Sequence, residues 1–342
     1  MNLHEIYVPR TMYGELKLPS VELEGIVTVE RFRGKVCTGI WKFKNLITNV
    51  GLDAMRPYDG TRLDQILVWM GVGTGSTAPA ATDTALVAEL TPLTTHRTQG
   101  NGGFSDSRGF GPSFSYGWAK RVRLFLEAQA NGNLTEFGWF QTQTGGPMFS
   151  RMLFKDEFGV PTTIVKTAAD QLRVTYEIRI YPPADDSLGT LLISGTNHNT
   201  IVRPANVDDT LAWLPLPFGF SSSTGGFGNT IHRAAAVETN VMANRENELG
   251  GTQEIINVGS PPGTQGITPA AYTNGTFVRD SELRWDPGVA NFATGIGGIL
   301  LAGGFTNPGN GFLFQSTFTP KVMKTDTFRF FLNVQYSWMR RP

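Results

Sequence analysis

One stretch of strictly alternating side chains constrains the fold of this chain more than any other feature. Within Asp170 to Tyr181 the apolar positions are every second residue, namely Leu172, Val174, Tyr176, Ile178 and Ile180. Successive side chains of a β-strand point to opposite faces, so the pattern predicts a strand with one buried and one solvated face. Pro182 and Pro183 follow directly and are expected to end the strand, because proline cannot donate a hydrogen bond to a ladder.

The same design returns near the end of the chain. Every second residue there is again apolar, namely Phe328, Phe330, Leu332, Val334, Tyr336 and Trp338. The preceding residues also correspond: Val165-Lys166-Thr167 matches Met323-Lys324-Thr325, and Met148–Phe154 aligns with Phe312–Phe318. We interpret these pairs as two copies of one β unit, with chance similarity between generic hairpins as the alternative.

The composition agrees with a turn-rich β protein. Of the 342 residues, 40 are Gly and 20 are Pro, and 40% are hydrophobic, which is enough for a sizeable core. We therefore predict an all-β fold of two β-sandwich-like domains built on the duplicated unit, with short helices and long Gly-rich loops. The expected boundaries are an extended N-terminal arm over 1–20, a first β domain over 21–184 and a second over 185–342.

Several local elements can be predicted from shorter patterns. A hairpin is expected from 25–32 and 36–43, and a buried central strand from 66–72. Short helical segments are expected after Asn49 as N-cap, over 84–89 with Asp83 as N-cap, and over 234–247. The glycines at 73–75 suggest a phosphate-binding loop. However, no lysine follows in the required spacing and Pro79 interrupts the segment, so a structural turn is favoured.

Charge and cysteine content exclude several classes of function. The 29 basic residues balance the 29 acidic ones, so the sequence provides no electrostatic footprint for nucleic acid or an anionic membrane. Cys37 is the only cysteine, which excludes an intramolecular disulfide framework and a cysteine zinc site. With no signal-peptide pattern and no apolar run of membrane-spanning length, we expect a soluble protein made in a cytoplasm.

Residues that could carry chemistry are few. His4, His96, His198 and His232 lack metal-ligand spacing and are expected at the surface, so no metal and no cofactor are predicted. Neighbouring carboxylates such as Asp156 with Glu157, or Asp280 with Glu282, are candidates for a glycan-cleaving pair, and solvated surface charge explains them at least as well. Trp213 and Trp285 could stack on sugars or belong to the core. We expect no catalytic residues and no enzyme activity.

Aromatic residues in two Gly- and Ser-rich loops are the candidate contact residues. The loops are 98–116 and 214–229, and aromatic rings dominate the energetics of protein interfaces. The candidates for subunit contact are Phe104, Phe110, Phe114, Tyr116, Phe218, Phe220 and Phe227.

An ordered series of phrases resembles a family of tailed-bacteriophage virion proteins of the tail-fibre, collar and baseplate type. The phrases are Asn45–Asp53 (NLITNVGLD), Gly71–Pro79 (GVGTGSTAP), Thr82–Leu86 (TDTAL), Leu134–Phe140 (LTEFGWF), Leu153-Phe154 and Gln171–Tyr176 (QLRVTY). No phrase is specific alone, so the resemblance rests on their ordered combination. It covers about residues 25–183.

The resemblance implies an oligomeric, all-β structural component of the virion that is made in the host cytoplasm. Its implied partners are other copies of itself and other virion proteins, with no nucleic acid and no membrane. Two alternatives are a tail protein that binds a host surface glycan, and a capsid decoration protein. The phrases do not distinguish a collar, baseplate, fibre or capsid position.

Overall fold

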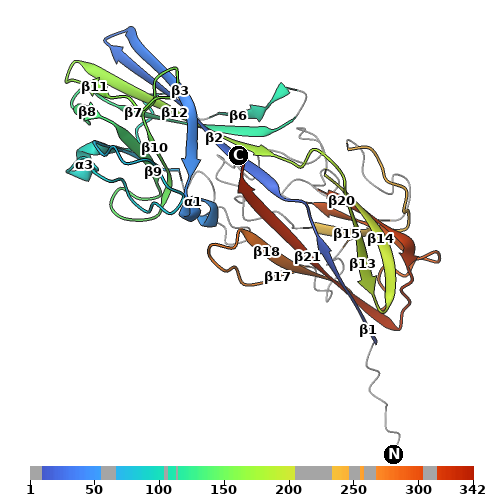
Figure 1. Ribbon diagram of the computed structural model, residues 1–342. Helices are drawn as coiled ribbons and strands as arrows, with labels where there is room; N and C mark the ends of the chain where they lie inside the picture. Colours follow the sequence, from blue (N-terminus) through green and yellow to red (C-terminus); the bar gives the residue numbers. More distant parts are fainter. Residues whose placement is uncertain are drawn as a thin grey trace, which may run out of the picture.

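A computed structural model describes residues 10–54, 67–103, 107–112, 115–204, 233–245, 255–257, 267–302 and 314–342. Regular structure in these residues is almost entirely β, with the helices α1 (Asn49–Ala54) and α3 (Leu93–His96) as short exceptions. The all-β prediction is therefore confirmed. The molecule is elongated, with the strands of the first half of the sequence gathered toward one end and most of those of the second half toward the other (Figure 1).

The alternating stretch forms the strand β12 (Asp170–Tyr181), and its exposure alternates without exception. Its five apolar side chains are at most 2% exposed. β12 pairs antiparallel with β2 (Val21–Arg33) on one side and β7 (Gly117–Phe125) on the other, so it lies inside the sheet. The second alternating stretch forms β21 (Phe328–Arg340), which buries every second side chain from Phe330 to Trp338. Both strand predictions are confirmed.

The described strands form three sheets. The largest is mixed and has the order β17-β18-β21-β2-β3-β10-β9-β4-β5, with β1 on β21, β12 on β2, β7 on β12 and β6 on β7. A second sheet has the order β13-β14-β20-β19-β15-β16, and β8 pairs with β11. The remaining strands are β1 (Arg10–Lys17), β3 (Val36–Ile47), β4 (Trp69–Gly73), β5 (Arg97–Thr98), β6 (Ser107–Phe110), β8 (Gly132–Leu134), β9 (Glu136–Phe140), β10 (Met148–Leu153), β11 (Ile164–Lys166), β13 (Ser187–Ile193), β14 (Thr196–Pro204), β15 (Arg233–Val237), β16 (Ile255–Asn257), β17 (Ile267–Pro269), β18 (Val278–Trp285), β19 (Ile296–Ala302) and β20 (Phe314–Val322).

The N-terminal strand belongs to the end of the molecule that β21 occupies. β1 pairs in parallel with β21 over its whole length, from Arg10 opposite Phe328 to Lys17 opposite Gln335. The start of β2 then pairs in parallel with the end of β21, before the rest of β2 pairs with β12. The blue and red strands consequently run side by side along the molecule (Figure 1). The segment 1–20 is predicted from the sequence as an extended arm that packs on another part of the structure. From Arg10 onward it pairs with the last strand, β21.

Strand pairing overturns one local prediction from the sequence and leaves two others in place. Part of the segment expected to be helical over 234–247 forms β15, whose residues Ala234 to Val237 are buried and pair with β19. The prediction is wrong there because burial against a sheet overrides the helix propensity of alanine. The expected hairpin and the helix near Asn49 are confirmed. The hydroxyl of Thr48, one residue earlier than expected, caps the helix by accepting the amide of Gly51 at 2.9 Å.

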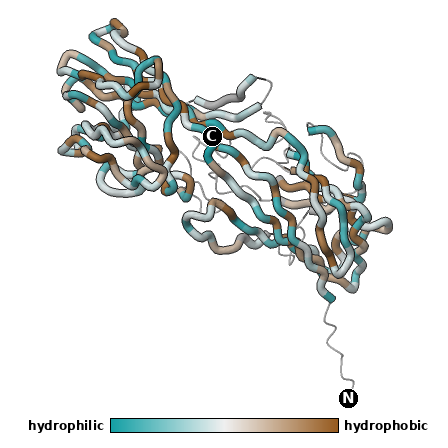
Figure 2. The backbone as a smooth tube through the Cα atoms, viewed as in Figure 1, coloured by the Kyte–Doolittle hydropathy of each residue, from teal (hydrophilic) through white to brown (hydrophobic). Residues whose placement is uncertain are grey.

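One hydrophobic cluster extends through both ends of the molecule, from Met12 and Leu16 of β1 to Trp338 of β21. Apolar and polar residues alternate along the strands around it (Figure 2). The helix α1 contacts the C-terminal strand directly, because the indole Nε1 of Trp338 donates to the carbonyl oxygen of Leu52 at 2.9 Å. Packing and hydrogen bonds therefore connect the first and last strands of the described chain.

Candidate functional site

Of the seven aromatic contact candidates, the structure describes the side chain of Tyr116. Its ring centroid lies 4.9 Å from that of Tyr181, and the guanidinium of Arg179 lies 4.6 Å from its centre. Phe110 belongs to β6, and its side chain lies outside the described structure. The other five, Phe104, Phe114, Phe218, Phe220 and Phe227, lie outside the described residues. Their role in subunit contact stays a prediction.

Tyr116 belongs to a half-buried network on the polar face of β12. Arg179 donates to Glu177 at 2.6 Å, and the hydroxyl of Tyr181 donates to Glu24 at 2.7 Å. Burial, followed by the bond to Glu24, raises the pKa of Tyr181. The network fixes the rings and charges of this face against one another, so the face presents an ordered surface.

A buried ion pair lies beneath the loop that follows β4. The side chains of Glu136 on β9 and Arg151 on β10 are both 0% exposed, and Arg151 Nε donates to Glu136 Oε2 at 2.9 Å. Arg151 also pairs with Asp83 at 2.7 Å and donates to the carbonyl oxygen of Thr77 at 2.9 Å. We call Glu136, Arg151 and Asp83 the Glu136 cluster. It joins two neighbouring strands to two points of the loop.

The carboxylate of Glu136 accepts the main-chain amides of that loop. Gly75, Val87 and Ala88 donate to it at 3.1, 3.2 and 2.7 Å. A Cβ at Gly75 would overlap the carboxylate, which explains the glycine. The loop thus has the amide chemistry of an anion-binding turn, but the anion is a side chain of the protein itself. This supports the structural-turn interpretation of the glycine-rich phrase.

The same cluster corrects the helix expected over 84–89. Residues 84–88 form no helix, with a bend at Ala85 and a turn at Val87 and Ala88, and Glu89 forms an isolated bridge to Gly73. Asp83 accepts the amide of Ala80 at 2.8 Å and pairs with Arg151. Asp83 therefore acts in a turn and an ion pair rather than as a helix cap, because four amides of the loop are oriented toward Glu136 or Asp83.

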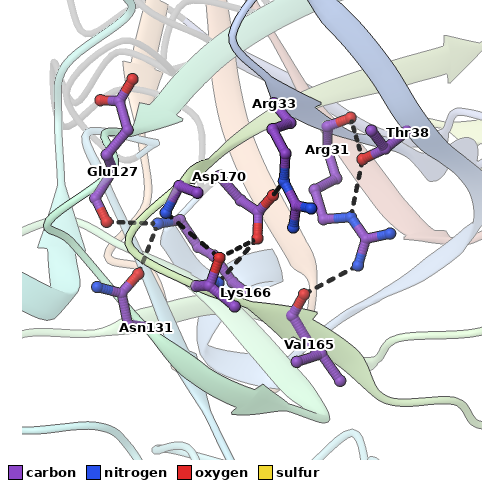
Figure 3. A network of polar contacts seen from close by, with 10 residues as sticks. Arg31, Arg33, Thr38, Glu127, Asn131, Val165, Lys166 and Asp170 are labelled. Atoms are coloured by element: carbon purple, nitrogen blue, oxygen red, sulfur yellow. Dashed lines mark hydrogen bonds and ion pairs between the residues drawn. The ribbon is translucent and has the colours of Figure 1, made fainter.

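A second polar network lies where β11 leads into β12 (Figure 3). The ammonium of Lys166, which is 1% exposed, donates to the carbonyl oxygens of Leu126 and Glu127 and to Asn131 Oδ1 at 2.9, 3.3 and 2.9 Å. Burial lowers the pKa of Lys166 to about 8, although the carboxylates of Asp170 and Glu127 oppose the change. The lysine side chain thus orders the turn after β7 by binding the main-chain carbonyl oxygens of that turn.

Beside Lys166, the carboxylate of Asp170 begins β12. It accepts the hydroxyl of Thr167 at 2.6 Å and the guanidinium Nε of Arg33 at 3.0 Å. These bonds, that from Thr167 first, hold the pKa of Asp170 far below its usual value. The carboxylate is 1% exposed and ties the hairpin end of β2 to the first residue of β12. Its role here is structural.

An equivalent lysine occurs before β21. The ammonium of Lys324 is 2% exposed and donates to the carbonyl oxygens of Asp286 and Val289 and to Asn291 Oδ1, at 2.8, 2.7 and 2.8 Å. Burial lowers its pKa to about 8 as well. In both sites the asparagine follows a buried alanine with positive φ, 52° at Ala130 and 55° at Ala290. The sequence motifs VKT and MKT thus mark two sites with the same chemistry.

The remaining candidates for chemistry have structural positions. Asp156 accepts the amides of Phe158 and Val160 in a turn, and Asp280 accepts Gln335 at 3.2 Å. Trp285 is 0% exposed and stacks on Phe330 with a centroid distance of 5.4 Å, so the sugar-stacking hypothesis for Trp285 is wrong. Trp213 lies outside the described residues.

The described histidine and metal-ligand candidates do not form a metal site either. His198 is buried on β14 and donates through Nδ1 to the carbonyl oxygen of Pro320 at 2.6 Å, so the expectation of a surface position is wrong for it. His4 and His232 lie outside the described structure. No group of three or more His, Cys, Asp or Glu within the described ranges is placed to hold a metal ion.

Sequence reasoning missed a pocket of about 340 Å³ that opens beside Trp69. Its walls come from β4, the segment around α3 and β5, the turn after β7 and the turn between β9 and β10. We call it the Trp69 pocket. Its residues are far apart in the sequence and form no motif, so only the pairing of β4 with β9 and β5 brings them together.

Comparisons with known proteins do not assign the chain to a class. No protein family, no curated protein and no solved structure matches it. In the part of the chain that the structure describes, no helix has the length and apolar character needed to cross a bilayer.

Proposed function

We propose that this chain is a structural subunit of a tailed-phage virion, which assembles by subunit contacts into a tail, collar, fibre or baseplate appendage. The observation that carries the proposal is that three of the phrases behind the resemblance meet in the Glu136 cluster. The glycine-rich phrase supplies Gly75 and Thr77, the TDTAL phrase supplies Asp83, and the LTEFGWF phrase supplies Glu136. The three phrases therefore belong to one local structure, which supports treating their ordered combination as a single feature.

We propose further that the chain contains two β-sandwich-like domains built on a duplicated unit. The two buried lysines support this, because they repeat the donor, two main-chain acceptors, the asparagine acceptor and the preceding alanine with positive φ. The strand order supports it too: β4-β9-β10 are neighbours in one sheet, and β15-β19-β20 are neighbours in another. Each set is followed in sequence by a long alternating strand.

An open strand edge provides a route to assembly. β3 pairs with β2 from Val36 to Asn45, whereas among the described residues its other edge pairs with β10 only at Leu46 and Ile47. Val36 and Ile40 on this hairpin are 65% and 64% exposed. An edge with unpaired main-chain groups and apolar side chains favours addition of a strand from a neighbour. In this proposal the protein functions by forming contacts with neighbouring subunits, without catalysis and without a cofactor.

Oligomeric state and particle labelling test the proposal. Native mass spectrometry of the full chain should show a defined homo-oligomer, and antibodies against the chain should label an appendage on virions in negative stain. Val36→Lys and Ile40→Lys should weaken the oligomer, while Phe158→Lys, at a turn residue that is 82% exposed, should leave it intact. A monomer at all concentrations together with unlabelled virions would refute the assignment. Labelling of the capsid surface would favour a decoration protein instead.

A further inference from the structure

The Trp69 pocket has the chemistry of a binding site rather than of a packing defect. Its lining includes Trp69, Leu126 and three glutamines, Gln99, Gln129 and Gln143. Its volume of about 340 Å³ falls in the range of pockets that hold small ligands. Amide side chains have both donor and acceptor groups, so three of them around one cavity provide mixed hydrogen bonding without net charge.

The pocket is electrically neutral in effect. Among the described residues of its lining, Arg97 is the only one with a formal charge, and its guanidinium is paired with Glu89 at 2.5 and 2.8 Å. It also donates to the carbonyl oxygens of Thr142 and Gly145, and its Cζ atom lies 3.5 Å from the ring centre of Phe140. A phosphate or carboxylate ligand would therefore find no unpaired cation among these described lining residues.

Apolar surface is present beside the amides. Trp69 is half-buried and packs against the small cluster of Leu86, Phe140 and Met148, which holds the indole in place on β4. Leu126 is 48% exposed at the turn after β7. A rigid indole beside an exposed aliphatic side chain offers a platform for the C–H face of a ring, and this contact costs little side-chain entropy.

One of the glutamines is already oriented. The side-chain oxygen of Gln129 accepts the amide of Leu126 at 2.9 Å, which leaves its amino group as the donor for a ligand. Gln99 is exposed and Gln143 is half-buried, so both can adjust to a partner. Gly100 and Gly102 line the same pocket and keep its wall free of side chains.

We propose that the Trp69 pocket binds a neutral saccharide. A pyranose ring presents an apolar C–H face and a rim of hydroxyl groups that both donate and accept, and the pocket offers an indole and three amides to match them. A fully apolar ligand would leave the amides unpaired at a cost in free energy. The pocket borders α3 in the lobe opposite to the end where β1 begins (Figure 1), so it lies at the far end of the molecule from the N-terminal strand.

Binding of defined sugars to the full chain tests this proposal. Isothermal titration with neutral gluco-, galacto- and manno-oligosaccharides of two to four units should show binding by at least one of them, and acidic uronic-acid oligosaccharides should bind more weakly. Gln99→Ala and Gln143→Ala should each weaken binding about three- to tenfold, the expected effect of losing one hydrogen bond. Gln335→Ala, on β21 in the other lobe, should leave binding unchanged.

Tryptophan fluorescence provides a second readout. Saccharide should change the emission of the parent protein, and Trp69→Phe should abolish the change if the variant retains the parent far-ultraviolet spectrum. Absence of binding by every neutral oligosaccharide, stronger binding of the acidic ones, or affinities unaffected by both glutamine variants would overturn the proposal. Oligomeric state and virion labelling are independent of all these outcomes, so the assembly proposal stands or fails separately.

Discussion

Replacing Glu136 by Gln tests how the glycine-rich loop is held. The substitution keeps the shape of the side chain but removes its charge beside the fully buried Arg151. It also replaces one carboxylate oxygen by an amino group, which would face either the amides of Gly75 and Ala88 at Oε1 or the amide of Val87 at Oε2. Removing one partner of a buried pair typically costs about 3–5 kcal/mol. Because Asp83 still pairs with Arg151, we expect the lower end, about 3 kcal/mol.

A double variant separates the ion pair from the main-chain bonds. Exchange of a buried ion pair for apolar residues of similar volume is often neutral or stabilising. Glu136→Leu combined with Arg151→Met would nevertheless leave three loop amides without their acceptor. The amide of Gly75 is buried and costs about 1–3 kcal/mol when unsatisfied, and the part-buried amides of Val87 and Ala88 add smaller costs. The double variant is therefore expected to be destabilised by at least as much as Glu136→Gln.

Urea unfolding and amide exchange measure these effects. The free energy of unfolding should fall by about 3 kcal/mol or more in both variants. Exchange at Val87 and Ala88 should accelerate more than exchange at the β12 amides, since the loop opens while the central strand remains paired. A double variant as stable as the parent, with Val87 and Ala88 still protected, would show that Glu136 does not hold the loop.

Three further substitutions, one of them with a matched control, test other contacts. Gly51→Ala should severely destabilise the protein in thermal unfolding, because its Cβ would overlap the carbonyl oxygen of Phe149. The control Gly34→Ala lies in an open turn with φ 59°, and its free energy of unfolding should change by only about 1 kcal/mol. Trp338→Phe removes the bond to Leu52 and should cost about 1–3 kcal/mol in denaturant unfolding. Asp170→Asn should destabilise most at neutral pH. The depressed pKa means that the carboxylate stabilises the fold above about pH 4 and that this contribution is lost as pH falls through the folded-state pKa, so the difference from the parent in acid titrations should shrink at low pH.

Patterns of side-chain period predicted the strands well and the loops poorly. The alternation in β12 and β21 was sufficient because one face of each strand is buried, and a strand with one buried face has a fixed side-chain period. The same reasoning could not place β1, whose parallel partner β21 lies more than three hundred positions away in the sequence. It also assigned a helix to 234–247, since alanines carry no period that reveals a buried strand.

Pairs of charged residues explain why the loop contacts could not be predicted. Glu136 and Arg151 stand in neighbouring strands, yet nothing in their local sequence shows that both are buried. Asp83 and Asp170 sit in turn-like sequence that commonly carries solvated acids. The lysine motifs were visible as an internal sequence repeat, but the repeat alone did not indicate that each lysine binds the main chain of a distant turn.

The buried charges share one physical function, which accounts for how a glycine-rich chain orders long loops. Glycine loops bring little apolar surface to a core and lose much conformational entropy on folding, so hydrophobic burial alone orders them weakly. One buried ion can accept or donate several main-chain hydrogen bonds: Glu136 accepts three amides, and Lys166 and Lys324 each donate to two carbonyl oxygens. Charge-assisted bonds are about twice as strong as neutral ones, so each ion orders a turn that apolar packing would leave loose. The side chains on the outer surface of such loops are then not needed to stabilise the loop, so their identity can be set by contacts with other molecules.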